Sequence, residues 1–282
     1  MNPDTCSLLV EFADIRWRNQ TVSIEYQWVG RERVGRPLWV FLHEGLGSVA
    51  LWQEFPSRLC ATLDCQGLIY SRPGYGQSSP RAPNEHWGTD FMHQQAYEVL
   101  PALLETLGVD PQQEHLSLLG HSDGGSIALL YAARFAQQVA ATVVLAPHIM
   151  VEEVCLKGIA RARKAYLESG LRQRLVRFHR DPDSAFWGWN DAWLDPAFAS
   201  WTIESELPAI MCPLLAIQGL NDEYGTLEQI RGIARRVPQT ELIELPDCRH
   251  SPHRDQTQRV IEAVHHFFQH HSDQSTPLGD IE

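Results

Sequence analysis

Residues 118–126 read LLGHSDGGS and place a serine between glycines at the end of an apolar run. Gly120 stands two residues before Ser122, and Gly124 stands two residues after it. The segments before and after the serine are typical of a strand and a helix. A serine in a tight strand-to-helix turn projects out of the sheet, and Cβ atoms at the glycine positions would collide with backbone. The stretch predicts a G-x-S-x-G turn; a capping serine in a glycine-rich turn is the simpler alternative.

Apolar runs elsewhere in the chain predict that this strand–turn–helix unit is part of an α/β fold. Short runs rich in β-branched residues alternate with amphipathic segments, which is typical of a mostly parallel sheet flanked by helices. The predicted central strands lie in residues 37–45, 67–76, 115–122, 142–148 and 213–222. A shorter run at 241–245 predicts one more strand.

Helical spacing of apolar residues marks two segments. Residues 89–108 carry such a stripe and end at Gly108, a predicted C-cap, while Pro101 predicts a kink inside the helix. Residues 257–268 carry a second stripe and predict the last helix, packed on the sheet.

One long segment lacks the alternation of strands and helices. Residues 149–211 contain helical patterns and many aromatic residues but no strand pattern, so they predict a helical cap inserted into the fold. The predicted organisation is a core formed by residues 1–148 and 212–271, the cap between them, and a loose polar tail at 272–282.

The charge balance narrows the expected partners. The chain carries 23 Lys and Arg against 35 Asp and Glu, a formal net charge of −12, which does not favour binding to phosphate backbones or anionic lipids. No apolar run approaches the length of a membrane span, and the first residues lack the pattern of a secretory signal. We therefore expect a cytoplasmic protein without nucleic-acid or membrane partners. The sequence leaves open whether it acts as a monomer or a homodimer.

Metal binding is not expected. The six cysteines are scattered, without the paired spacing of a zinc site, so free buried thiols are predicted. His266 and His270 stand four residues apart in the last predicted helix, but they lie opposite its apolar stripe and lack a third ligand.

The side chains that a serine nucleophile needs follow downstream. A serine hydroxyl attacks efficiently only when a histidine takes its proton, and a carboxylate orients that histidine. Asp222 follows an apolar strand, and His250 lies in DCRHSPH before the last helix. The predicted catalytic residues are Ser122, Asp222 and His250, in that order along the chain. Glu223 and His253 are the alternatives for the acid and the base.

With these motifs in this order, the sequence resembles the α/β-hydrolase superfamily from LWVFLHEGLG at 38–47 to VIEAVHHFF at 260–268. The resemblance implies an α/β-hydrolase fold and an oxyanion hole made of two backbone N–H groups. One belongs to Asp123, directly after the serine, and the other to Gly45. Glu44 occupies the usual place of a glycine, so it is predicted either to be solvated or ion-paired or to sit at the pocket.

A second stretch, YSRPGYGQS at 70–78, resembles the superfamily's glycine-rich turn D-x-x-G-x-G-x-S. Ser71 takes the aspartate position and Arg72 follows it, and the turn is assigned a structural role. His148 stands where the chain would leave the sheet for the cap, so it either touches substrate or is a buried structural histidine. His121, beside the serine, is predicted to be packed or hydrogen-bonded rather than a second base.

An activated serine with an oxyanion hole implies acyl transfer through an acyl-enzyme, with no cofactor. The predicted function is a serine hydrolase, most simply a carboxylester hydrolase, acting on a small acyl substrate. Thioesters, and the C–C bonds cut by capped hydrolases of aromatic degradation, are the alternatives; those C–C hydrolases usually carry methionine where this chain has Asp123. From another class, a non-catalytic receptor for a small ligand could use the same fold.

Aromatic residues are dense in the predicted cap. Six lie within sixteen residues: Phe186, Trp187, Trp189, Trp193, Phe198 and Trp201. Part of this cluster is expected to anchor the cap, and the rest to roof an enclosed apolar pocket above the serine. The residues predicted at the pocket are Glu44, His148, Trp187 and Trp189. Such a pocket predicts a preference for short or medium acyl chains or aromatic esters.

Overall fold

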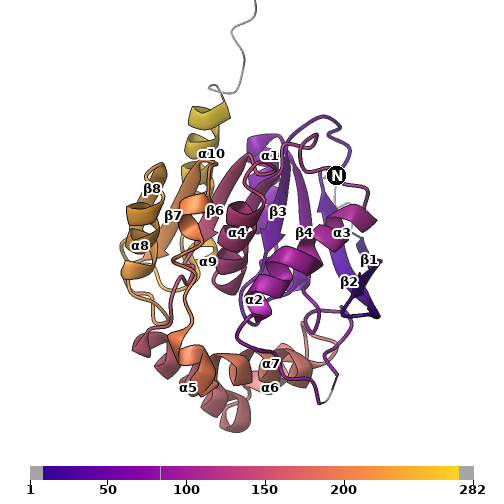
Figure 1. The fold of residues 1–282 in the computed structure, drawn as a ribbon, viewed down its shortest axis with the longest axis vertical. Helices are drawn as coiled ribbons and strands as arrows, with labels where there is room; N and C mark the ends of the chain where they lie inside the picture. Colours follow the sequence, from indigo (N-terminus) through magenta and orange to yellow (C-terminus); the bar gives the residue numbers. More distant parts are fainter. Residues whose placement is uncertain (1–8, 83, 273–282) are drawn as a thin grey trace, which may run out of the picture.

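The computed structural model describes residues 9–82 and 84–272, and within them eight strands form one sheet in the order β1-β2-β4-β3-β5-β6-β7-β8 (Figure 1). The strands are β1 (Val10–Trp17), β2 (Gln20–Val29), β3 (Leu38–Leu42), β4 (Gln66–Tyr70), β5 (Ser117–His121), β6 (Ala141–Leu145), β7 (Leu214–Gly219) and β8 (Thr240–Leu245). Strand β2 pairs antiparallel with β1 and β4, and all other neighbours are parallel. The predicted mostly parallel α/β sheet is confirmed.

The central strands are apolar throughout because helices cover both faces of the sheet. All five residues of β3 are buried, and their side chains alternate between two cores. Leu38, Val40 and Leu42 belong to one core, and Trp39 and Phe41 belong to the other. The alternation fixes which residues of each strand support which helical layer.

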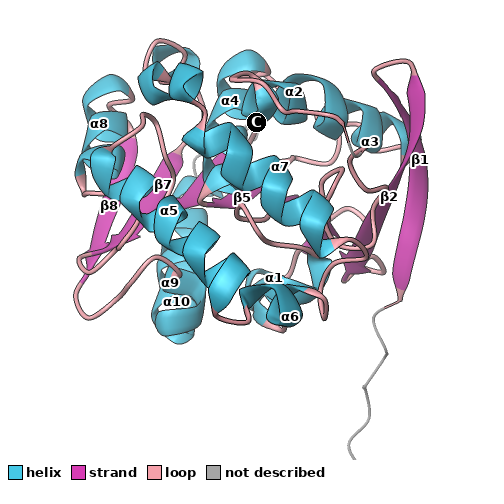
Figure 2. Ribbon diagram, turned by 90° about the horizontal axis from the view of Figure 1, so that it is seen from below, coloured by secondary structure: helices cyan, strands magenta, loops and turns pink. Residues whose placement is uncertain are grey.

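The helical layers lie on opposite sides of the sheet (Figure 2). The helices are α1 (Phe55–Leu63), α2 (Phe91–Gln94), α3 (Leu100–Thr106), α4 (Asp123–Arg134), α5 (Glu153–Glu168), α6 (Leu171–Leu175), α7 (Pro182–Leu194), α8 (Glu228–Arg236), α9 (Pro252–Asp255) and α10 (Thr257–Ser272). Helices α1 and α10 cover one face, and α2, α3, α4 and α8 cover the other. The predicted last helix is thus α10.

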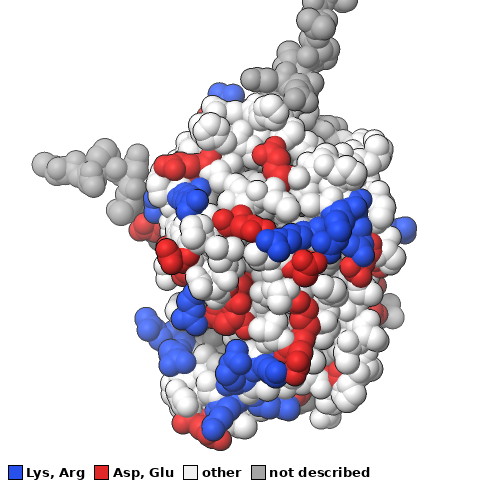
Figure 3. Space-filling model, turned by 90° about the vertical axis from the view of Figure 1, so that its left-hand side faces the viewer, with Lys and Arg blue, Asp and Glu red and all other residues white. Residues whose placement is uncertain are grey.

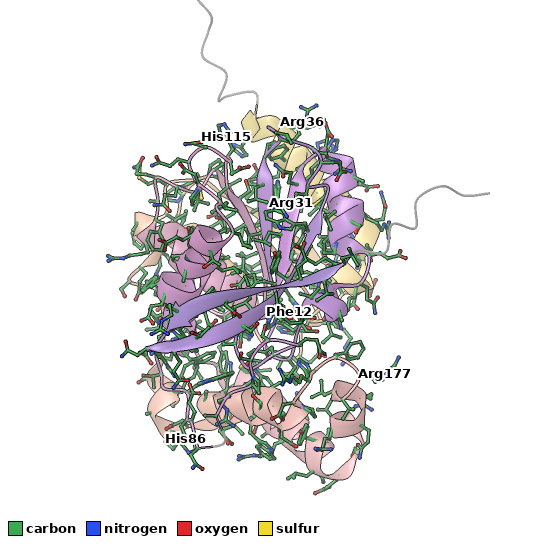
Figure 4. All side chains as sticks on the ribbon, turned by 90° about the vertical axis from the view of Figure 1, so that its right-hand side faces the viewer. Phe12, Arg31, Arg36, His86, His115 and Arg177 are labelled. Carbon is green, nitrogen blue, oxygen red and sulfur yellow. The ribbon has the colours of Figure 1, made fainter. Side chains whose placement is uncertain are left out.

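The β1–β2 hairpin has no counterpart among the predicted strands. Only three of the eight side chains of β1 are buried, and they alternate with exposed ones, so the strand contains no apolar run. Phe12 lies on its outer face and is 54% exposed (Figure 4). An antiparallel edge strand with one solvated face follows a period of two rather than a continuous apolar pattern.

The helix predicted at residues 89–108 runs from Phe91 to Thr106, and its middle is a π-helical turn, Gln95–Val99. This turn directly precedes the segment that contains Pro101. Proline donates no N–H, and its ring crowds the carbonyl four residues earlier, so a wider turn at this point accommodates it.

The residues between β6 and β7 fold into α5, α6, α7 and two short 3₁₀ helices, Pro196–Ser200 and Leu207–Ala209. These helices gather at the end of the sheet where the parallel strands terminate (Figure 1). The segment leaves and rejoins the sheet through a short antiparallel contact between Met150 and Thr202. Helix α10 includes Ser272; the rest of the tail predicted at 272–282 lies outside the described residues.

Across residues 9–82 and 84–272, no helix has both the length and the apolar character of a membrane span. The same residues contain no group of three or more His, Cys, Asp or Glu side chains placed to hold a metal ion. Five cysteines in this part of the chain are buried and not in disulfides, and Cys6 lies outside it.

Candidate active site

The turn between β5 and α4 has the geometry that its glycines suggest. Ser122 has φ 53° and ψ −120°, a region that side-chain-bearing residues rarely adopt. A Cβ at Gly120 would lie 2.1 Å from the carbonyl oxygen of Gly124, and a Cβ at Gly124 would lie 2.0 Å from that of Leu42. Only glycine fits either position, because each contact is with backbone that cannot swing away.

Ser122, His250 and Asp222 form a continuous hydrogen-bonded row. Ser122 Oγ lies 2.9 Å from His250 Nε2, and His250 Nδ1 lies 2.8 Å from Asp222 Oδ1. Asp222 also accepts the Tyr224 backbone N–H at 2.8 Å and a Gln218 side-chain N–H at 3.1 Å. Burial would raise the pKa of Asp222, but the hydrogen bond with His250, the charge of that ring and the Tyr224 N–H together lower it. The row can move a proton from Ser122 to a histidine held by a carboxylate.

The alternative acid and base lie elsewhere. Glu223 pairs with Arg249 at 2.9 Å and accepts the backbone N–H of His250 at 3.3 Å, so it does not reach the His250 ring. His253 is buried, with its ring centroid 4.9 Å from that of Trp52. Neither ring nitrogen of His253 has a hydrogen-bond partner among the described residues.

The two residues predicted to supply backbone N–H groups to an oxyanion hole, Gly45 and Asp123, both border the cavity at Ser122. Asp123 begins α4, where an N–H has no partner inside the helix and the helix dipole favours negative charge. Gly45 lies in the loop after β3 and borders the same cavity as Ser122. Within the described part of the chain, neither N–H donates to a protein acceptor.

A cavity of about 110 Å³ opens beside Ser122, between the ends of the strands and the inserted helices. Cys155 and Ile159 reach it from α5, and Trp189 and Trp193 reach it from α7. A larger hollow of about 370 Å³ beside the β1–β2 turn contains none of the residues of the hydrogen-bonded row.

The prediction that Trp187 lines this cavity is wrong. Trp187 lies on α7 two residues before Trp189, and two residues of an α-helix point to nearly opposite sides. Its ring packs 5.0 Å from Phe186 and lies under the Arg163 guanidinium. Trp193, one turn beyond Trp189, takes the place at the cavity.

Glu44 and His148 both border the cavity, and both also have structural contacts. The Glu44 carboxylate lies 3.5 Å from His121 Nδ1 and 3.4 Å from Arg254 Nη2. Burial would raise the pKa of Glu44, but these partners lower it well below its usual range. Burial lowers the pKa of His148 to about 3, with the neighbouring His250 adding to the effect, so its ring is neutral at neutral pH.

Two further histidines connect loops around the site. His121 Nε2 lies 2.7 Å from the carbonyl oxygen of His250, in agreement with a hydrogen-bonded rather than a reacting role. His179 accepts the Gly76 backbone N–H at 2.9 Å and bonds the Leu46 carbonyl at 3.0 Å, so it joins the cap to the loop after β3. His115, by contrast, lies at the end of the molecule opposite the inserted helices (Figure 4).

The glycine-rich turn obtains its carboxylate from another strand. Ser71 occupies the usual aspartate position and donates to Glu25 Oε2 at 2.6 Å, and the same oxygen accepts the Gln77 backbone N–H at 2.8 Å. Glu25 lies on β2, in the hairpin that the sequence did not predict. No motif in the turn itself signals this partner.

Other residues at the cavity were also not predicted. Tyr224 lies two residues after Asp222, and its ring centroid is 4.7 Å from that of His250. Cys155 and Ile159 stand four residues apart on α5, a spacing that places them on one helix face. That spacing is a signal in the sequence, but it does not say which face of the helix meets the cavity.

A family model described as the alpha/beta hydrolase family matches residues 39–263. A comparison with curated protein sequences gives no match. Among solved structures, a thermophilic esterase from Thermogutta terrifontis is similar with a TM-score of 0.70 and 16% identity, covering 93% of this chain and 99% of the other. An enol-lactonase from Burkholderia xenovorans has a TM-score of 0.68 and 20% identity, with 88% and 97% covered.

A meta-cleavage product hydrolase from Pseudomonas fluorescens is also similar, with a TM-score of 0.69, 15% identity, and 91% and 97% of the two chains covered. At such identities these likenesses concern the fold alone. The family match covers most of the chain and agrees with the sheet order and the inserted helices described above. The chain therefore belongs to the alpha/beta hydrolase family.

Proposed function

We propose that this chain is a serine hydrolase that cleaves small carboxylic esters in the cytoplasm. The observation that carries the proposal is the row from Ser122 through His250 to Asp222, with distances of 2.9 and 2.8 Å, at the wall of a small cavity. Nucleophile, base and orienting acid within hydrogen-bond reach are what acyl transfer requires.

In this proposal, Ser122 Oγ attacks the acyl carbon while His250 Nε2 takes its proton. Asp222 accepts the Nδ1–H and stabilises the imidazolium that forms. The oxygen of the tetrahedral intermediate accepts the N–H groups of Gly45 and Asp123. His250 then protonates the leaving alcohol, and a water molecule hydrolyses the acyl-enzyme by the same route. The chemistry needs no metal or organic cofactor.

The size of the cavity supports short acyl groups. A cavity of about 110 Å³ is smaller than the several hundred cubic ångströms of a drug-sized pocket. Trp189 and Trp193 line it from helix α7, and both are more than nine-tenths buried. An acyl chain of a few carbons suits this space, and a long fatty chain would have to displace the α7 side chains.

A parallel assay of p-nitrophenyl esters, acyl-thioesters and vinylogous diketones tests the proposal. We expect steady turnover that is fastest with a short ester, and loss of both turnover and fluorophosphonate labelling in Ser122→Ala. Faster turnover of the thioester or the diketone would assign the chain to those reactions. One turnover followed by tight product binding would favour a receptor. Equal labelling of the variant would show that another residue is the nucleophile.

A further inference from the structure

A buried arginine lies between the two sides of the proposed oxyanion hole. Arg72 follows β4, in the glycine-rich turn, and its side chain is 1% exposed. A guanidinium carries a permanent charge and five N–H donors, so burying it is costly unless it is paired. The groups that the Arg72 guanidinium bonds therefore indicate its role in the structure.

The Glu44 carbonyl accepts three hydrogen bonds: one from the Gly47 backbone N–H at 3.0 Å, within the same loop, and two from side chains. Arg72 Nη2 donates to it at 2.8 Å, and His43 Nδ1 lies 2.7 Å from it. His43 Nε2 accepts the backbone N–H of Arg72 at 3.0 Å, so the proton of the neutral ring is on Nδ1, and Nδ1 donates. Burial, followed by the charge of Arg72, lowers the pKa of His43 well below its usual range, in keeping with a neutral ring.

The same peptide unit carries the proposed oxyanion donor. In a planar trans peptide the carbonyl of one residue and the N–H of the next point in opposite directions, and no peptide bond of the described residues is cis. Bonds that hold the Glu44 carbonyl toward Arg72 and His43 therefore hold the Gly45 N–H away from them. Gly45 borders the cavity at Ser122.

The guanidinium also faces the residue that carries the other donor. Arg72 Nη1 lies 3.8 Å from Asp123 Oδ2, and Trp193 Nε1 donates to Asp123 Oδ1 at 3.2 Å. The buried carboxylate of Asp123 thus lies between a cation on one side and an indole N–H on the other. The Arg72 guanidinium thus contacts a group next to each proposed donor. It bonds the Glu44 carbonyl, which shares a peptide unit with the Gly45 N–H, and it faces the side chain of Asp123.

We propose that Arg72 is a positioning residue that orients the Glu44–Gly45 peptide, and with it the Gly45 N–H, toward the oxygen of the transition state. The inference rests on the proposed function, since it assigns a role in the same acyl transfer. Arg72 does not touch the substrate in this scheme. It acts through a donor whose removal in oxyanion holes typically lowers kcat by about 10²- to 10³-fold.

Arg72→Lys and Arg72→Met test the role. Lysine keeps the charge but loses the forked geometry, and methionine loses both. A matched control is Arg33→Met, because Arg33 also bonds two backbone carbonyls, those of Cys60 and Cys65, at 3.0 and 2.8 Å. Those carbonyls precede β4, at the end of the sheet away from Ser122, so the control reports only structural loss.

Steady-state kinetics with p-nitrophenyl acetate and binding of a trifluoromethyl ketone that forms a tetrahedral adduct are measured on variants shown to be folded by circular dichroism. We expect kcat to fall about 100-fold in Arg72→Met and about 10-fold in Arg72→Lys, with KM within about 3-fold of the parent. The affinity for the ketone should fall in parallel, and Arg33→Met should keep both values.

A folded Arg72→Met variant with the parent kcat, or with a loss confined to KM, would overturn the inference, as would an equal loss of kcat in Arg33→Met. If Arg72→Met does not fold, Arg72→Lys and His43→Asn decide, because the latter removes the other side-chain bond to the Glu44 carbonyl. A lower kcat at unchanged KM supports the role, and an unchanged kcat overturns it. A parent chain without Ser122-dependent turnover would instead overturn the proposed function itself.

Discussion

Ser122 is held in a backbone conformation that its neighbours enforce. The Ser122 backbone N–H donates to the carbonyl of Leu145 on β6 at 2.9 Å, and the flanking glycines lie so close to neighbouring backbone that neither position has room for a Cβ atom. A residue held in such a conformation costs roughly 1–3 kcal/mol, which the packing of the β5–α4 unit must offset. This backbone conformation places the Ser122 hydroxyl within hydrogen-bond distance of His250.

Asp222 and Glu223 are adjacent carboxylates with different partners, so they can be compared directly. Asp222→Asn should lower kcat about 10³- to 10⁴-fold, because the asparagine cannot hold the productive tautomer of His250 or stabilise its charged form. Glu223→Gln is the matched control and should change kcat by less than about 3-fold, since Glu223 reaches only the His250 backbone and Arg249. A reversed order of the two effects in steady-state assays would identify Glu223 as the orienting acid.

Substitution of His253 tests whether this residue, the alternative to His250, acts as the base. Its ring packs against Trp52 and Phe55, and both ring nitrogens lack a hydrogen-bond partner among the described residues. Because a buried unsatisfied polar group costs about 1–3 kcal/mol, His253→Phe should keep or raise the free energy of unfolding. It should also keep most of the kcat, whereas His250→Ala should be inactive. Urea unfolding and ester hydrolysis check both statements; an inactive, folded His253→Phe would contradict them.

We expect helix α7 to set the upper limit on the length of the acyl chain. Trp189 packs on Gly45 so closely that an added Cβ there would lie 2.1 Å from Trp189 Nε1. In the parent chain kcat/KM should fall once p-nitrophenyl esters exceed medium length, because a cavity of about 110 Å³ has little room for a longer chain. Trp189→Leu should move the optimum toward longer chains, with Trp187→Leu as the control on the opposite side of α7. A parent activity that rises steadily from acetate to palmitate would contradict the enclosed pocket.

How far the sequence determines the site depends on the kind of element involved. Strands β3 to β7 and the elbow at Ser122 follow from local patterns, because buried parallel strands are continuous apolar runs and the elbow requires glycine at fixed positions. The edge strand β8 is partly exposed and gives only a shorter pattern. The face of α7 that meets the cavity depends on how the cap docks, which is a tertiary property, so Trp187 was predicted in place of Trp193. Glu25 supports the glycine-rich turn from a distant strand for the same reason.

Buried histidines make the stability of the whole molecule depend on pH. Burial lowers the pKa of His148 to about 3 and that of His179 to about 4, and it lowers the pKa values of His43 and His253 well below the usual range. In the unfolded chain these rings take up protons near pH 6.5, whereas the folded chain does not. Stability is therefore highest above about pH 6.5 and falls as the pH decreases toward the folded-state values.

Each such histidine should contribute a loss of up to about 1.4 kcal/mol per pH unit below that point. Urea unfolding at pH 7, 6 and 5 measures the total slope. His253→Phe removes one of these four histidines and should therefore reduce the slope by up to about 1.4 kcal/mol per pH unit. A free energy of unfolding that is flat between pH 7 and 5 would contradict the account.

The charge of the molecule should also select among substrates. Acidic and basic side chains are interspersed over β8 and α8 (Figure 3), where Arg231 pairs with Glu244 and Arg235 with Glu228. At the cavity the balance differs: Glu44 and Asp123 border it, and among its described lining residues none is Lys or Arg. The ionised Glu44 beside Ser122 should repel an anionic acyl group.

We therefore expect p-nitrophenyl succinate, with its free carboxylate, to have a kcat/KM at least about 10-fold below that of p-nitrophenyl valerate, which is neutral and of similar length. The difference should shrink at high salt, because screening weakens the repulsion. Glu44→Gln should also reduce it. Equal kcat/KM values for the two esters at low salt would contradict a charge-selective cavity.

The two ends of the insertion lie side by side where they meet the sheet. The chain departs and returns where Met150 lies against Thr202, and the adjacent Ile203 N–H donates to the Ile149 carbonyl at 2.8 Å. Because these ends are already held together, the entropic cost of closing the loop depends only weakly on how many residues it contains. Exchange of residues 152–200 at these two neighbouring points would therefore install a different roof over Ser122. The new segment would have to replace the bonds that Trp193 makes with Asp123 and His179 makes with Gly76 and Leu46, so the roof and the site beneath it must change together.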